Sequence, residues 1–533
     1  MPIHHPDMDH WSTTFPSSIK DLDFPSIFLP ITFCLVISYL AWKALRPAKT
    51  PLPPGPRPLP VVGNLPFLDP ELHTHFAALS LLHGPIFKLR LGSKLCVVIS
   101  SPSGARSVLK DNDVIFANRD VPAVTKTVAY GGQDIVFTPY GPEWRMLRKV
   151  CVVKMLSNNT LDSVYALRRK EVRRAVRGLY ERAGTEVDIG EWMFMMIMNV
   201  VTSMLWGETL KGDEREGIRL EFRDVVGEIT TLLAMPNLSD FFPILRRFDL
   251  QGVEKRMKRS VEKLDHVFEW VIEKRLKLNK DHVGSGDRLK NEKTQGEDFL
   301  QFLIRLKDEE EDPKTPLTVF KIKALLTDMV VGGTDTTSNS IELTLAEIFN
   351  RPSIVRKIQE ELDVVVGKGG IVEESHINKL PYLLAVMKES LRLHPVLPLL
   401  VPHCPSKTCT IEGYTVPKGS RVFVNVWAIH RDPMIWENPN EFNPDRFLDG
   451  KGDYSGNDFC YFPFGAGRRI CAGIAMAERM VMYSLATLMH SFNWGLPGGR
   501  EVDVMEKFGI VLKKKTPLIA IPSPRLSDPN LYD

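Results

Sequence analysis

The stretch Phe464–Gly473 reads FGAGRRICAG and places one cysteine, Cys471, between glycines and beside two arginines. A cysteine binds iron only as the thiolate, which nearby cations and backbone N–H groups stabilise. Gly467 and Gly473 would let the main chain turn tightly around the sulfur, and Arg469 could pair with a haem propionate. The stretch therefore predicts a loop that presents a thiolate to haem iron. A buried structural cysteine in a glycine turn is the simpler alternative.

This loop resembles the signature of the cytochrome P-450 family, F-x-x-G-x-R-x-C-x-G, and it has the required residue at every fixed position of that signature. Such a match rarely arises by chance. The resemblance implies haem b (iron protoporphyrin IX) as the cofactor, Cys471 as the axial ligand of its iron, and Phe464 and Arg469 as further haem-binding residues. It also implies the cytochrome P-450 fold, which is mainly α with small β-sheets (α+β), together with an N-terminal transmembrane helix.

A second informative run, GGTDTT at 332–337, lies inside a stretch of helical periodicity, Thr318–Phe349. Glycine and threonine are weak helix formers. We expect the paired glycines to open the helix and leave room for a diatomic ligand, and the Thr336 hydroxyl to bond the carbonyl of Gly332. Asp335 adds a titratable group for proton delivery.

The same run resembles the family motif A/G-G-x-D/E-T-T. The resemblance implies that Asp335 and Thr336 are catalytic, because splitting dioxygen requires two protons at its distal oxygen. On its own, a threonine-rich kink in a buried helix is more often a packing feature. Its occurrence together with the cysteine loop favours the catalytic interpretation.

Other positions resemble residues that contact the haem propionates in this family. Trp144 and Arg148 are four apart and share a helix face, as in the family's W-x-x-x-R helix. His403, in the run VPHC, matches a position where relatives place an arginine or a histidine against the other propionate. Neither His403 nor His430 has metal-ligand spacing, and we interpret His430 as structural.

Glu389 and Arg392 are three apart on a predicted helix that ends before Pro395. Such a pair is usually a solvated surface contact. The family's E-x-x-R motif instead implies a buried network with an arginine from a P-x-R-F segment, and Arg446 in NPDRF supplies it here. We assign this triad to folding and haem retention, because an unpaired buried charge is costly.

The charge balance limits the possible partners. The chain has 533 residues with 68 basic and 65 acidic side chains, a net charge of +3, which gives no case for nucleic acid as a partner. No Rossmann glycine fingerprint precedes a predicted helix, so electrons are expected from a separate NADPH-dependent cytochrome reductase, as the resemblance implies. A cationic surface formed by Arg145, Lys149 and Lys154 could bind this reductase, if the reductase presents an acidic surface. The alternative is that these residues form an ordinary basic helix face.

An uncharged apolar segment near the N-terminus has the length of a membrane-spanning helix. It covers residues 24–42, is followed by Lys43, Arg46 and Lys49, and is preceded by mostly acidic charges. The positive-inside rule then places the rest of the chain in the cytosol, and the scattered cysteines agree with a reducing compartment. A cleaved signal peptide, the alternative, would have the reverse charge order.

The expected organisation is therefore a lumenal tail (1–23), a transmembrane anchor (24–42), a basic and proline-rich hinge (43–60) and a catalytic domain (61–533). The hinge contains PLPPGPRP at 51–58, which cannot be helical and should act as a stiff spacer. The protein is expected to be a single-pass protein of the endoplasmic reticulum membrane with its catalytic domain in the cytosol.

Periodicity and turn signals predict the remaining elements. Helices are predicted over 163–182, 253–279 and 318–349, a surface loop over 280–297, strands over 86–91 and 96–99, a hairpin over 411–420 and a strand over 421–427.

The resemblance extends to plant microsomal enzymes of the A-type group, which oxidise terpenoids, flavonoids and other specialised metabolites. It implies a monooxygenase that inserts one atom of O2 into a small hydrophobic substrate. By similarity, the substrate-lining segments are Val121–Val136, Phe222–Ala234, Asp328–Thr336, Val396–Leu400 and Phe508–Val511. The apolar run VLPLL at 396–400 predicts a terpenoid substrate, such as a sesquiterpene. The alternative is a flavonoid, which polar residues of the first segment would suit.

Two other classes of function compete with terpenoid or flavonoid hydroxylation. A family member can catalyse dehydration or rearrangement, for example of an aldoxime, and a haem protein can be a sensor without enzymatic activity. The intact pair Asp335 and Thr336 favours the monooxygenase, because enzymes that bypass oxygen activation have less need of it.

Overall fold

The computed structural model describes residues 50–207, 213–284, 298–309, 314–450 and 452–533. The chain divides after Pro51, and the unit described here is Leu52–Asp533. The predicted tail and transmembrane anchor and the first part of the hinge lie outside the described residues. Residues 51–58 form no helix, as expected for a proline-rich segment.

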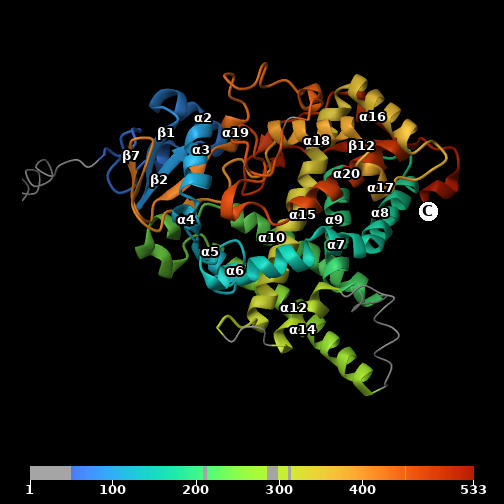
Figure 1. Cartoon of the computed structure of the whole chain (residues 1–533), viewed down its shortest axis with the longest axis horizontal. Helices are drawn as coiled ribbons and strands as arrows, with labels where there is room; N and C mark the ends of the chain where they lie inside the picture. Colours follow the sequence, from blue (N-terminus) through green and yellow to red (C-terminus); the bar gives the residue numbers. More distant parts are fainter. Residues whose placement is uncertain (1–49, 208–212, 285–297, 310–313, 451) are drawn as a thin grey trace, which may run out of the picture. The chain divides into compact units, whose positions relative to one another are not determined.

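Helices form most of this unit, with α9, α15 and α20 at the centre of the view in Figure 1. The helices are α2 (Leu72–His83), α3 (Pro102–Arg106), α4 (Asp113–Phe116), α5 (Ala123–Val128), α6 (Pro142–Lys149), α7 (Asn158–Ser163), α8 (Tyr165–Tyr180), α9 (Ile189–Trp206), α10 (Asp213–Ala234), α11 (Leu238–Phe241), α12 (Val253–Gly284), α14 (Phe299–Asp308), α15 (Val319–Phe349), α16 (Pro352–Val365), α17 (Glu374–Ile377), α18 (Pro381–Leu393), α19 (Val426–Ile429) and α20 (Ile474–Ser491).

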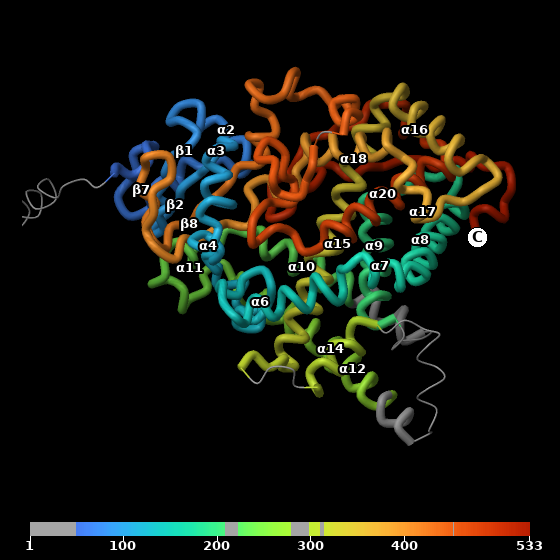
Figure 2. The backbone as a smooth tube through the Cα atoms, in the orientation of Figure 1, coloured from blue at the N-terminus to red at the C-terminus, as the bar shows by residue number. Residues whose placement is uncertain are grey.

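Four small sheets accompany the helices, so the predicted α+β class with a helical majority is confirmed. The largest sheet has the order β1-β2-β8-β5-β3, in which β8 runs parallel to β2. Figure 2 shows this pairing of an early and a late segment of the chain. The strands are β1 (Ile86–Leu91), β2 (Lys94–Ile99), β3 (Asn118–Arg119), β4 (Val187–Asp188), β5 (His403–Cys404), β6 (Cys409–Ile411), β7 (Tyr414–Val416), β8 (Arg421–Val424), β9 (Phe492–Gly495), β10 (Glu506–Lys507), β11 (Lys513–Lys514) and β12 (Ile519–Pro524).

Helix α15 is the main helix of the core. It begins after Thr318, whose side chain accepts a hydrogen bond from the N–H of Lys321, and it packs against α9 and α20. Most of its side chains are buried, but Asp328, Val331, Gly332, Gly333 and Thr336 keep accessible surface in its middle. Among them, Asp328, Gly332 and Thr336 are spaced four apart. Since these residues are four apart, they share one face of the helix. That face has accessible surface where a ligand could contact α15.

Three predicted elements differ from the structure. Helix α15 runs unbroken through the glycine pair at 332–333, because tertiary packing on its buried sides outweighs the weak propensity of glycine. The predicted loop over 280–297 begins with helix, since α12 continues to Gly284, and residues 285–297 lie outside the described part. The predicted strand over 421–427 ends at Val424, where the Asn425 side chain caps α19 by accepting from the Ala428 N–H.

Candidate active site

Cys471 lies between a 3-10 turn, η6 (Gly467–Arg469), and the start of α20. Gly467 has φ +67°, and a Cβ there would approach the Leu109 carbonyl oxygen to 1.9 Å, so only glycine fits. Gly473 has an ordinary φ of −99°, and its contribution is an N–H that donates to Cys471 Sγ at 3.3 Å. The Cys471 N–H donates to the Phe464 carbonyl at 3.0 Å, which closes the loop.

The surroundings of the Cys471 thiol act on it in two directions. Burial raises the pKa of this thiol, whereas the Gly473 N–H and the charge of Arg148 lower it. Arg148 donates to the Ile470 carbonyl at 2.6 Å, which fixes its guanidinium beside the loop. Cys471 nevertheless keeps accessible surface. The loop therefore holds this cysteine and still leaves it open to a ligand.

The predicted relay residues lie on α15, which packs against α20. Thr336 Oγ1 donates to the Gly332 carbonyl at 2.6 Å, which is the hydrogen bond expected from the sequence. A Cβ added at Gly332 would meet no atom within 4 Å, so the helix borders open space at this point. Asp335 is buried, and its Oδ1 accepts from Asn339 Nδ2 at 3.1 Å and from Lys513 Nζ at 2.9 Å.

Partly or fully buried basic side chains from three parts of the chain come together near the cysteine loop. Arg469 donates to the carbonyls of Ala117 and Ile135 at 2.7 and 2.9 Å, and Arg119 donates to the Val401 carbonyl at 2.5 Å. Burial and the charge of Arg469 lower the pKa of Arg119 to about 9. Burial also lowers the pKa of Arg469 to about 10.

His403 belongs to the same basic cluster. Its Nδ1 lies 2.8 Å from the carbonyl oxygen of Phe116, which makes Nδ1 the protonated nitrogen. Burial and the charge of Arg119 hold the pKa of His403 well below its usual range. Arg119 Nε is buried and has no hydrogen-bond partner among the described residues. The charge repulsion of Arg119 by Arg469 and a buried donor without a partner among the described residues fit an anionic ligand, so these residues fit the two propionates of haem.

Trp144 and Phe464 complete the set of predicted haem-binding residues. Trp144 Nε1 donates to the Ile135 carbonyl at 3.0 Å, and the guanidinium of Arg469 lies 4.5 Å from the centre of the Trp144 ring. Phe464 is half-buried and packs edge-on against Tyr454 with the ring centres 5.3 Å apart. Trp144 therefore contacts Arg469 directly, whereas the Phe464 ring packs against Tyr454.

Arg119 belongs to this cluster, but it lies in none of the sequence motifs that predict haem-binding residues. It lies on β3, which pairs with β5 so that Arg119 is opposite His403 in the register. In the sequence FANRD, nothing distinguishes this arginine from one on the surface. Only the pairing of two strands that are far apart in the chain brings it into the cluster.

Glu389, Arg392 and Arg446 are brought together as predicted. Glu389 and Arg392 are fully buried, and the carboxylate accepts two hydrogen bonds from the Arg392 guanidinium, at 2.7 and 2.8 Å. Arg446 Nε lies 3.4 Å from the same carboxylate. Arg392 also donates to the carbonyls of His430 and Pro439, at 2.8 and 2.7 Å. The pair thereby fixes the segment that follows α19, and the buried His430 lies in this structural region.

Two carboxyl groups occupy the predicted substrate-lining segments. Asp134 accepts from the N–H groups of Phe137 and Thr138 at 2.9 and 3.0 Å, and Asp328 accepts from the Ile135 N–H at 2.7 Å. Burial raises the pKa of Asp134 to about 6. Burial and the proximity of Asp134 raise the pKa of Asp328 well above its usual range. Asp328 therefore keeps its proton to a higher pH than an exposed aspartic acid does, and it lies half-buried in the middle of α15.

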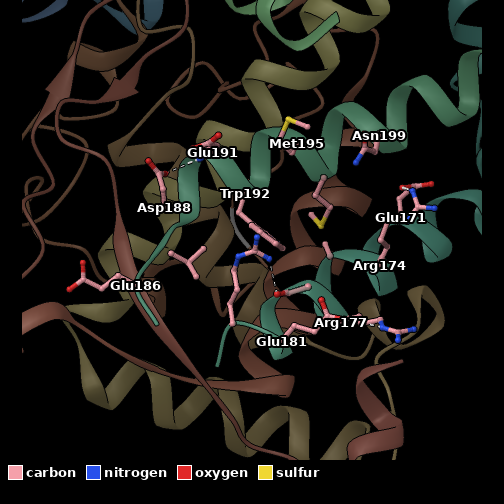
Figure 3. A pocket seen from close by; sticks show the side chains of 15 residues that line it. Glu171, Arg174, Arg177, Glu181, Glu186, Asp188, Glu191, Trp192, Met195 and Asn199 are labelled. Carbon is pink, nitrogen blue, oxygen red and sulfur yellow. Dashed lines mark hydrogen bonds and ion pairs between the residues drawn. The ribbon is translucent and has the colours of Figure 1, made fainter. Parts of the chain in front are cut away.

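A cleft of 680 Å³ lies elsewhere, between α8 and α9 (Figure 3). Arg182 stacks over the Trp192 ring at 4.9 Å in it, and the Asp188 side chain accepts from the Glu191 N–H at 2.9 Å to cap α9. No predicted site residue lines this cleft.

Within the described residues, α9 is also the one helix long and apolar enough to cross a membrane, but two thirds of it is buried in the core.

Comparison with known proteins identifies the family. Residues 53–521 match the family model of cytochrome P-450. A flavonoid 3'-monooxygenase of Arabidopsis thaliana is 40% identical over 518 residues, which cover 96% of this chain and 98% of the relative. A 3,9-dihydroxypterocarpan 6A-monooxygenase of Glycine max is 38% identical over 506 residues, which cover 92% and 96%. A flavonoid 3'-monooxygenase of Crocosmia x crocosmiiflora is 41% identical over 514 residues, which cover 94% and 98%.

Solved structures agree with this match. A zebra fish cytochrome P-450 with progesterone superposes with a TM-score of 0.72 at 26% identity, covering 86% of this chain and all of that chain. A zebra fish cytochrome P-450 with abiraterone gives a TM-score of 0.70 at 25% identity, covering 85% and 99%. The chain therefore belongs to the cytochrome P-450 family, and it is a monooxygenase that binds haem b.

Proposed function

We propose that this monooxygenase hydroxylates a flavonoid or a closely related phenolic compound. The observation that carries the proposal is the agreement of several relatives, named flavonoid 3'-monooxygenases, that are 38–41% identical over nearly the whole chain. A sesquiterpene was our first prediction from the sequence. The relatives support the flavonoid alternative better, and we adopt it.

Asp328 supports a phenolic substrate. This acid lies on the accessible face of α15, eight residues before Thr336, which is roughly 12 Å along the helix axis. That span suits a three-ring molecule with one ring near the relay and a hydroxyl group at the other end. The half-buried Asp328 carboxyl can form a hydrogen bond with such a hydroxyl, whereas a hydrocarbon offers no hydrogen-bond partner to a polar group that it covers.

The overall reaction consumes two electrons and two protons. A substrate C–H bond, O2, NADPH and H⁺ give the hydroxylated product, water and NADP⁺. Haem would supply the oxygen chemistry when bound, and Cys471 would hold its iron. Its propionates would be held by Trp144, Arg148 and His403, together with Arg119 and Arg469, and the half-buried Phe464 would support the loop.

Protons reach dioxygen through the side chains of α15. Asp335 takes up a proton at Oδ2, the oxygen that has no hydrogen-bond partner among the described residues. Thr336 then passes the proton on by rotating its hydroxyl away from the Gly332 carbonyl. The triad of Glu389, Arg392 and Arg446 serves folding and haem retention.

We also propose the cellular setting. The exposed Arg145, Lys149 and Lys154 form a cationic surface for an NADPH-dependent cytochrome reductase. Residues 24–42 anchor the chain in the endoplasmic reticulum membrane as a single span, with the tail 1–23 in the lumen, the hinge 43–60 as spacer and the catalytic domain 61–533 in the cytosol.

Exposed apolar residues beside α11 support contact with the membrane surface. Ile244, Phe248 and Leu250 are 82%, 58% and 61% exposed, and Arg246 and Arg247 lie between them. Apolar side chains flanked by arginines are typical of segments that lie in the membrane interface.

The test is turnover of a mixed flavonoid and sesquiterpene panel by the full chain in microsomes with a plant reductase under oxygen-18 gas. We expect a hydroxylated flavonoid that carries one labelled oxygen atom. A labelled sesquiterpene with no labelled flavonoid would contradict the substrate assignment. Product without label would support dehydration or rearrangement. Absence of turnover would support a haem sensor. A ferrous–CO spectrum without the red-shifted Soret band would contradict ligation by Cys471.

A further inference from the structure

The buried Asp335 carboxylate has a cationic partner that no sequence motif indicates. Lys513 Nζ lies 2.9 Å from Asp335 Oδ1, the oxygen that also accepts from Asn339 Nδ2. The other oxygen, Oδ2, is buried and has no hydrogen-bond partner among the residues that the structure describes. One oxygen of the carboxylate is thus held by a charge and an amide, and the other is free.

Lys513 reaches α15 from a C-terminal hairpin made of β10 and β11, in which Lys507 is opposite Lys513 and Glu506 is opposite Lys514. The next side chain, Lys514, points away and donates to the Thr516 carbonyl at 2.7 Å. Successive side chains of a strand alternate in direction, so the register of this hairpin decides which lysine meets Asp335.

The hairpin is itself fixed to the rest of the fold. The Leu512 N–H donates to the Val396 carbonyl at 2.8 Å, and the Phe508 N–H donates to Glu71 Oε2 at 2.7 Å. The Glu506 carboxylate accepts from Trp427 Nε1 at 3.1 Å and also contacts His394. These hydrogen bonds fix the position of the hairpin, and with it the position of Lys513 relative to Asp335.

Exposure differs sharply across the ion pair. The Lys513 side chain is 44% exposed, whereas that of Asp335 is 3% exposed. Lysine buries its methylene stem and keeps its ammonium near water. In this pair, the lysine therefore extends from solvent to a carboxylate that is otherwise closed off by protein.

We propose that Lys513 is a positioning residue for proton delivery in oxygen activation. Its ammonium compensates the charge of Asp335 and holds Oδ1, which leaves Oδ2 as the oxygen that accepts protons supplied by water. Each proton enters at Oδ2 and leaves toward dioxygen through Thr336, so Asp335 returns to the carboxylate and Lys513 stays an ammonium throughout. The inference rests on the relay role proposed above for Asp335 and Thr336.

The first test measures product formed per NADPH consumed, and hydrogen peroxide released, by the full chain in microsomes with reductase. Lys513→Met is expected to lower the product per NADPH about tenfold, since a positioned acid–base group contributes roughly 10²–10⁴ in rate and only part of this is lost. Lys513→Arg should restore most of it. Lys515→Met, at the exposed residue two positions on, is the matched control and should behave like the parent. A K513M variant as well coupled as K515M would overturn the proposal.

Combination with Asp335→Asn separates a relay role from a general structural one. If Lys513 acts through Asp335, adding K513M to D335N should cause no further uncoupling, and the solvent deuterium isotope effect should rise in K513M but not in K515M. Independent additive losses in the double variant, or unchanged isotope effects in K513M, would overturn the proposal.

A third measurement does not depend on turnover. The ion pair should appear as non-additivity in the midpoint of thermal unfolding, with the K513M and D335N shifts, each about 1–3 °C, failing to sum in the double variant. Additive shifts would contradict the pairing. All turnover assays use whichever compound of the panel is hydroxylated, so a wrong flavonoid assignment leaves this test valid.

Discussion

Arg119→Met should weaken haem retention while the protein still folds. In the structure, the Arg119 guanidinium lies beside Arg469 and His403, its Nε has no hydrogen-bond partner among the described residues, and Asp134 is the carboxylate whose charge acts on it. A haem propionate would supply that anion. A hydrogen bond to a charged group contributes about 1.5–3 kcal/mol, and 1.4 kcal/mol is tenfold in an equilibrium constant. We therefore expect haem to dissociate roughly 10- to 150-fold more readily from the variant.

The assay is the rate of haem transfer from the purified enzyme to excess apomyoglobin, followed by absorbance. Arg106→Met is the matched control, because Arg106 is an arginine of α3 whose side chain is 61% exposed and whose ion pair with Asp111 spans 3.6 Å at the surface. Arg119→Lys keeps the charge but loses the planar fork, so it should fall between the two. Transfer from R119M at the rate of R106M would refute the assignment of Arg119 to a propionate.

Three further predictions concern other parts of the molecule. Asp328→Leu should raise KM for a hydroxylated flavonoid about 2- to 10-fold, from the loss of one neutral hydrogen bond, with little change in kcat, and an unchanged KM would exclude the contact. Glu389→Gln should leave the buried charge of Arg392 uncompensated and lower stability by about 3–5 kcal/mol, seen as a loss of folded holoprotein in chemical denaturation. The hydrogen bonds that His394 makes to Glu347 and Glu506 outweigh burial and raise its pKa above the usual range. Its stabilising contribution is therefore complete below the pKa of unfolded histidine and is lost as pH rises through the higher folded value, so the thermal midpoint of the parent should fall over this window and that of His394→Gln should not.

The sequence was most informative where chemistry needs residues close together in the chain. The Cys471 loop, the run that contains Asp335 and Thr336, and the Glu389–Arg392 pair each fit within ten residues, so spacing alone could indicate them. Arg119 and Lys513 could not be found in this way, because a strand pairing and a hairpin register bring them to their partners. Tertiary packing also decided where local propensity was misleading, as in the unbroken helix through the glycine pair of α15.

The β10–β11 hairpin links substrate specificity to proton delivery. Residues 508–511, predicted to line the substrate chamber, connect the strand that holds Glu506 to the strand that holds Lys513. Substitution within this connection can reshape the chamber without moving Lys513. Insertion or deletion of one residue would not leave Lys513 in place. A shift of one position exchanges the side chains on the two faces of a strand, so it would turn Lys513 away from Asp335. Variants of this enzyme selected for new substrates should therefore vary the side chains at 508–511 and conserve the length of the connection.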